Sequence, residues 1–289
     1  MSIDPQKVHE MRSHQIDVDV ISSMTIPACP RVLSDLREKL ADPDGDPVSI
    51  GKIVSGDAAL SISVLRMVNS PMFGLSRSIE SIPQAVSMLG VLKLEMLLQR
   101  VLIRQALVFP NVNLTRFWDT ADKRSMGMHR LAKELGGVNL ELARSFGLFC
   151  DIGLPLLMHR FPNYASTLKA ANDEPILPFT EVEFRNHGID HAQIGAMMAK
   201  SWGLSPILCK SIRCHHDYKI FLDPSETGEP VRLIAMMLIT DLAIQRHARL
   251  HGGQEWIKGG ESALGALLLN DQDLADCIDL LFDEFSATT

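Results

Sequence analysis

The stretch Gly147-Leu148-Phe149-Cys150-Asp151-Ile152-Gly153 decides the fold of this chain, because it sets one carboxylate into an apolar run. The pattern predicts a helix over about 141–160, which Pro155 bends or interrupts. Burying a carboxylate costs several kcal/mol unless a cation or hydrogen-bond donors meet it. Asp151 therefore needs a partner: it is either a residual metal ligand or one half of a structural pair with a nearby histidine.

Three later segments carry side chains of the same kind. They contain His191, the pair His215-His216, and Asp241, each within an apolar run of helical spacing. Imidazole and carboxylate groups are ligands for divalent cations. The sequence thus poses the question of whether these residues still hold a metal.

Composition narrows the class of protein. The chain has 289 residues, 46% hydrophobic content and a net charge of −7, which allows a large core and argues against a nucleic-acid partner. The five cysteines include no CxxC pair, so we expect reduced thiols in a cytoplasmic protein. The sequence contains no apolar run of membrane-spanning length, and we expect no membrane partner.

Helical periodicity runs through the chain, and no segment shows the alternation of a strand. Asp57 and Asp190 stand where N-caps belong, before helices that begin at Ala58 and His191. We therefore predict an all-α protein. Its expected parts are an N-terminal extension at 1–24, a helical subdomain at 25–112, a second helical subdomain at 113–252, and C-terminal helices at 253–289 that pack on the body.

Two sets of short motifs follow one another along the chain. The N-terminal motifs are Ile26-Pro27-Ala28-Cys29-Pro30, Ile53 to Leu60, Val64 to Ser70, and Ile79 to Gly90. The C-terminal motifs are Phe117-Trp118, Gly147 to Gly153, His191 to Ala196, Trp202, and Ile212 to His216. Taken together and in this order, the motifs resemble the HDOD family, a bacterial relative of the HD phosphohydrolases. The resemblance implies an HD-like helical bundle with an N-terminal helical subdomain.

The resemblance also assigns the positions of a metal site. HD enzymes bind metal through a first histidine, a His-Asp doublet and a final aspartate, and these positions hold Thr120, Cys150-Asp151 and Asp241 here. Both missing ligands are imidazoles. His129 cannot replace the first, because nine residues after Thr120 it falls on the opposite helix face, about 180° away. The Cys150 thiolate remains a candidate ligand for zinc.

The HD-GYP branch of the family adds histidines that His191, His215 and His216 resemble. We expect only one of His215 and His216 to face the pocket, since adjacent helical residues point about 100° apart. We expect His191 to be neutral, because a helix N-terminus disfavours a positive charge. If a metal binds at all, its ligands would be Asp151, His191, His215 and Asp241.

Two functions follow from the resemblance. The first is a non-catalytic, stand-alone signalling module that binds signalling proteins or a small ligand in two-component or cyclic-dinucleotide circuits, with no cofactor. The second is a metal-dependent phosphohydrolase of nucleotides or cyclic dinucleotides, with Mn, Fe, Zn or Mg held in a rearranged site.

Overall fold

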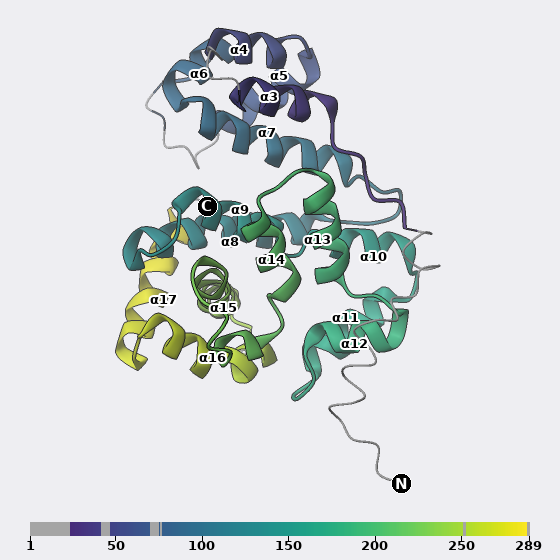
Figure 1. Cartoon of the computed structure of the whole chain (residues 1–289), viewed down its shortest axis with the longest axis vertical. Helices are drawn as coiled ribbons and strands as arrows, with labels where there is room; N and C mark the ends of the chain where they lie inside the picture. Colours follow the sequence, from purple (N-terminus) through teal and green to yellow (C-terminus); the bar gives the residue numbers. More distant parts are fainter. Residues whose placement is uncertain (1–23, 42–46, 70–74, 76, 251–252, 288–289) are drawn as a thin grey trace. The chain divides into compact units, whose positions relative to one another are not determined.

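The computed structural model describes residues 24–41, 47–69, 75, 77–250 and 253–287. All regular secondary structure in these residues is helical, which confirms the predicted all-α class (Figure 1). The predicted extension at 1–24 lies almost wholly outside the described residues. No helix in the described part of the chain is long and apolar enough to cross a membrane.

The described helices form two compact units, one within Pro27–Pro110 and one within Asn111–Ser286. The four-part division expected from the sequence stays a prediction. The helices of the first unit are α3 (Arg31–Ala41), α4 (Pro47–Ser55), α5 (Ala58–Val68), α6 (Ile82–Leu89) and α7 (Val91–Ala106).

Side-chain hydrogen bonds at helix ends and the apolar stripe of α5 (Leu60, Val64 and Val68) organise the first unit. Asp57 caps α5 as predicted, since its carboxylate accepts a hydrogen bond from the backbone N–H of Leu60. The side chain of Asn69, at the end of α5, bonds both the N–H and the C=O of Ile79 at 2.7 Å. This amide therefore satisfies the backbone of the segment before α6.

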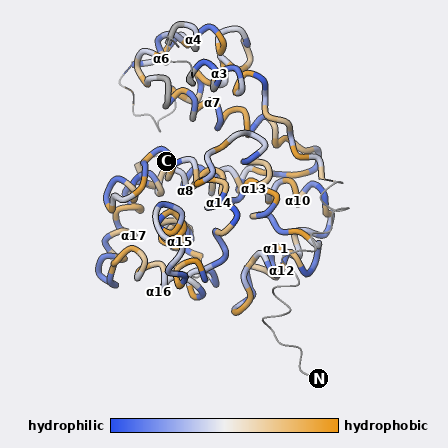
Figure 2. Tube along the Cα trace, in the orientation of Figure 1, coloured by the Kyte–Doolittle hydropathy of each residue, from blue (hydrophilic) through white to orange (hydrophobic). Residues whose placement is uncertain are grey.

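The second unit contains the remaining helices. They are α8 (Thr115–Leu135), α9 (Leu140–Phe149), α10 (Leu154–Arg160), α11 (Tyr164–Asp173), α12 (Phe179–His187), α13 (His191–Ser201), α14 (Pro206–Cys214), η2 (Tyr218–Phe221), α15 (Glu229–His247), α16 (Gln254–Leu267) and α17 (Asp271–Ser286). Its central element is α15, which is buried almost all round and packs against α8, α14, α16 and α17 (Figures 1 and 2). A helix that is apolar on every side is stable only when other helices cover it in this way.

The predicted helix over 141–160 is in fact two helices. α9 ends at Phe149 and α10 begins at Leu154, with Pro155 in its first turn. Proline lacks the N–H that would continue the earlier helix, whereas it is tolerated at a helix start. Asp151 therefore lies in the turn between α9 and α10, not within a helix.

Candidate functional site

Two glycines bring the turn that carries Asp151 close to its neighbours. A Cβ atom on Gly147 would lie 2.7 Å from the backbone oxygen of Arg124 in α8. A Cβ atom on Gly153 would lie only 2.0 Å from the backbone oxygen of His191 in α13. Neither approach is open to a residue with a side chain. The glycines at both ends of the motif thus place Asp151 between Arg124 and His191.

Arg124 is the buried cation of this site. Its Nη1 lies 2.9 Å from Oδ2 of Asp151, and its Nε lies 2.6 Å from Oδ1 of Asp241. Nη1 also lies 3.1 Å from the Cys150 sulfur, which accepts a hydrogen bond from it. Burial by itself lowers the pKa of Arg124, but Asp241 and the groups of Cys150 and Asp151 outweigh it and hold that pKa well above its usual value. The guanidinium therefore stays charged and joins the two carboxylates.

Reasoning from the sequence missed Arg124, although a signal was present. Arg124 follows Thr120 by four residues, so the two share one face of α8. Thr120 is half-buried one turn before the guanidinium, and Cys150 is fully buried at the end of α9. Burial raises the pKa of the Cys150 thiol well above its usual value, more than Arg124 lowers it, so the thiol is neutral in the metal-free protein.

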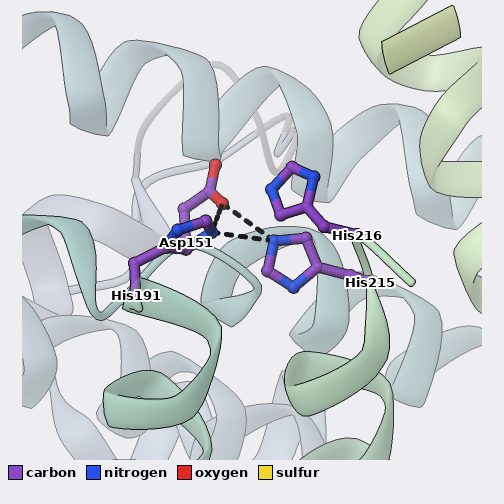
Figure 3. Close-up of side chains that lie close together, drawn as sticks. All are labelled: Asp151, His191, His215 and His216. Carbon is purple, nitrogen blue, oxygen red and sulfur yellow. Dashed lines mark hydrogen bonds and ion pairs between the residues drawn. The ribbon is translucent and has the colours of Figure 1, made fainter. Parts of the chain in front are cut away.

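The other carboxylate oxygen of Asp151 faces a pair of histidines. Oδ1 lies 3.4 Å from Nε2 of His191 and 3.3 Å from Nε2 of His215, and the two Nε2 atoms lie 3.1 Å apart (Figure 3). Both imidazoles are buried. One carboxylate oxygen of Asp151 therefore contacts the guanidinium of Arg124, and the other contacts the two histidines.

The hydrogen-bond partners of these two rings restrict which of their nitrogen atoms carry hydrogen. Nδ1 of His215 lies 2.7 Å from the Ile212 carbonyl, an acceptor only, so it carries hydrogen. Nδ1 of His191 lies 2.6 Å from Oε2 of Glu183, which also accepts the backbone N–H of His191. If His215 is neutral, its Nε2 is an acceptor, so the hydrogen between the rings belongs to His191. A neutral ring at His215 thus requires an imidazolium at His191.

The pKa shifts agree with this assignment. Burial lowers the pKa of His191, but Glu183 and Asp151 outweigh it and raise that pKa to about 10. Burial, reinforced by His216, lowers the pKa of His215 to about 4. The expectation of a neutral His191 at a helix start was therefore wrong. Two buried carboxylates stabilise its charge more than the helix N-terminus opposes it.

His215 and His216 both belong to the cluster, contrary to the expectation of one. α14 ends at Cys214 and His215 is its C-cap, so the pair lies at the helix end. His216 stacks on Phe179, with ring centres 5.1 Å apart and planes at 14°. Its Nδ1 lies 2.6 Å from Oε2 of Glu255 in α16. Figure 3 shows the two rings entering the site beside Asp151 and His191.

The cluster has the donor set of a cation site. One atom from each of Asp151, His191, His215 and His216 lies within 4.8 Å of the others, so within the described part of the chain these residues could jointly hold an ion. Each histidine has its Nδ1 on an acceptor, which is how protein metal sites orient Nε2 toward an ion.

Asp241 is not part of this group, although the sequence placed it in the pocket. Its carboxylate is bound to the Nε of Arg124. The HD arrangement does not fit a metal here: Thr120 and Cys150 replace two imidazoles, and a guanidinium lies between the two aspartates. The three histidines with Asp151 do fit one, once the proton on Nε2 of His191 is released.

Sequence comparison identifies the family. The chain matches the HDOD domain over residues 26–218 and belongs to that family. A Treponema pallidum (strain Nichols) protein, described as "Uncharacterized protein", is 28% identical over 194 residues, which are 66% of this chain. The chain spans 38% of the length of that relative.

Solved structures share the fold. A Shewanella amazonensis SB2B structure, described as "Putative phosphohydrolase", is 24% identical with a TM-score of 0.62, over 91% of this chain and 95% of the other. A Marinobacter aquaeolei VT8 structure, described as "Putative signal transduction protein", is 17% identical with a TM-score of 0.71, over 99% of this chain and 65% of the other. At these identities the likeness shows the fold alone.

Proposed function

We propose that this protein is a non-catalytic regulatory module of the bacterial cytoplasm. The observation that supports this is the guanidinium of Arg124, which joins Asp151 and Asp241. Metal-dependent hydrolysis needs an ion with an open position for an activated water. A guanidinium donates hydrogen bonds to both carboxylates but binds no hydroxide. The two aspartates thus have a structural role here.

A module of this kind acts by binding. Its partners in this proposal are signalling proteins or small ligands of two-component or cyclic-dinucleotide circuits. Membership of the HDOD family supports a regulatory role, and one protein of the same fold carries a signal-transduction description. The five cysteines are free thiols, in keeping with a reducing compartment.

Turnover assays test the proposal. Purified protein is incubated with nucleotides and cyclic dinucleotides in the presence of Mn²⁺, Fe²⁺, Zn²⁺ or Mg²⁺. We expect no hydrolysis above a protein-free blank. Hydrolysis that disappears in Asp151→Ala but persists in Asp119→Ala would refute the proposal. Asp119 is a matched control, because it is a largely exposed carboxylate on α8.

The convergence of Asp151 with three histidines favours a second candidate, a metal-dependent phosphohydrolase with one ion. Asp151, His191, His215 and His216 would hold the ion, with His216 in place of the expected Asp241. A bound divalent cation would supply Lewis-acid chemistry and an acidified water. Glu183 would orient His191, and the Ile212 carbonyl would orient His215.

Calorimetry with Zn²⁺ and Mn²⁺, combined with the turnover assay, separates the two candidates. The first predicts no turnover whether or not an ion binds. The second predicts one ion per chain and turnover, both lost in His215→Ala and retained in His159→Ala, a histidine at the end of α10 outside the cluster.

A further inference from the structure

Helix α16 reaches the histidine cluster through one carboxylate. Oε2 of Glu255 lies 2.6 Å from Nδ1 of His216 and 2.5 Å from the hydroxyl of Tyr218. Its Oε1 lies 2.7 Å from Nζ of Lys258, one turn further along α16. The Glu255 side chain is 19% exposed and that of Lys258 only 7%. Three donors from two segments thus fix this carboxylate in place.

The backbone of α16 is shaped for this contact. The ring of Tyr218 lies against Gly259, where an added Cβ would be 2.7 Å from the ring carbon Cγ. Gly259 follows Glu255 by four residues, so both are on one face of the helix. The missing side chain lets η2 and α16 approach until Tyr218 and His216 reach the same carboxylate.

The bond decides which nitrogen of His216 faces the cluster. A carboxylate only accepts, so Nδ1 of His216 carries hydrogen, and in the neutral ring this leaves the lone pair on Nε2. Free imidazole side chains favour the opposite form, with hydrogen on Nε2. Phe179 stacks on the face of the His216 ring, and this contact does not favour hydrogen on either nitrogen.

We propose that Glu255 is a positioning residue for the cluster, which presents Nε2 of His216 toward Asp151 and makes α16 part of the site. The family match ends at residue 218, so this contribution comes from outside the matched region. The inference goes beyond the regulatory function and does not depend on it, because the bond exists with or without an ion or a partner.

Nitrogen NMR of labelled, metal-free protein tests the inference. In the wild type we expect hydrogen on Nδ1 of His216 and none on Nε2. Glu255→Ala should move the hydrogen to Nε2, while Glu255→Gln, which keeps an acceptor oxygen, should restore the wild-type form. Glu261→Ala is the matched control, since Glu261 is an exposed carboxylate on the same helix.

Tyr218→Phe is a second variant, in case Glu255→Ala does not fold. It removes one donor to Glu255 but leaves the bond to His216, so the hydrogen should remain on Nδ1. Hydrogen on Nε2 in the wild type, or the same form of His216 in wild type and folded Glu255→Ala, would overturn the inference.

Discussion

The Nη1 atom of Arg124 lies 2.9 Å from Oδ2 of Asp151, and this pair joins two segments of the HD-like site. The same guanidinium holds Asp241 through its Nε. The carboxylates that an HD enzyme would use for metal are thus both paired with one side chain of the protein. This cation is covalently part of the chain, so it does not leave the site by dissociation.

Replacing Arg124 should destabilise the fold strongly. Arg124→Met leaves Asp151 and Asp241 without their cation, and removing one partner of a buried pair costs about 3–5 kcal/mol. Urea denaturation followed by circular dichroism measures the loss. Arg130→Met is the control on the same helix, because its ion pair with Glu134 is partly exposed and should contribute less than about 1 kcal/mol. Equal losses in the two variants would contradict the role of Arg124.

Stability should depend on pH through two histidines with opposite shifts. The folded pKa of His191 is about 10, above the unfolded value, so its contribution is complete below about pH 6.5 and is lost as pH rises through 10. The folded pKa of His215 is about 4, so its contribution is complete above about pH 6.5 and is lost as pH falls toward 4. The two contributions together predict a maximum near neutral pH.

Denaturation midpoints measured across this range check the alkaline side. His191→Gln should remove the decline that the wild type shows between about pH 6.5 and 10, so the stability difference between the two proteins should shrink as pH rises. A difference that is constant over this range would show that His191 is neutral in the folded protein.

Two glycines of α16 should respond to alanine in opposite directions. Gly259→Ala places a Cβ 2.7 Å from the Tyr218 ring and should destabilise the protein by about 1–3 kcal/mol. Gly265→Ala meets nothing within 4 Å and should stabilise it by about 0.5–1 kcal/mol, because alanine loses less backbone entropy. Thermal denaturation of both variants measures the difference. Destabilisation of the same size at both positions would mean that Tyr218 does not rest on α16.

Restoring the two missing imidazoles should not by itself restore the HD metal site. In Thr120→His with Cys150→His, Arg124 still occupies both carboxylates, and we expect no additional Mn²⁺ in calorimetry. Adding Arg124→Gln should give one more equivalent of bound Mn²⁺ than the double variant. The same stoichiometry in the two variants, as folded proteins, would show that the guanidinium is not what excludes the ion.

Local signals in the sequence were sufficient to predict the helical class and the N-caps. Asp57 and Asp190 accept the predicted backbone N–H groups, since a cap depends only on neighbours in the chain. The interruption at Pro155 was also foreseen, but its consequence for Asp151 was not. Apolar spacing continues across the turn, so periodicity alone could not show that two helices lie there.

The contacts that define the site are long-range, which is why the sequence left them open. Arg124 and Asp241 are 117 positions apart, and His216 and Glu255 are 39 apart. The charge on His191 depends on Glu183, which a local argument about the helix N-terminus did not include. The family resemblance located Asp151 and the histidines, but it could not indicate that Arg124 pairs with both aspartates.

Anomalous diffraction from crystals grown with Mn²⁺ tests the central claim most directly. The account predicts continuous density for the Arg124 guanidinium between Asp151 and Asp241, with no manganese peak between these two carboxylates. A manganese ion bridging both aspartates, with Arg124 displaced from them, would contradict it.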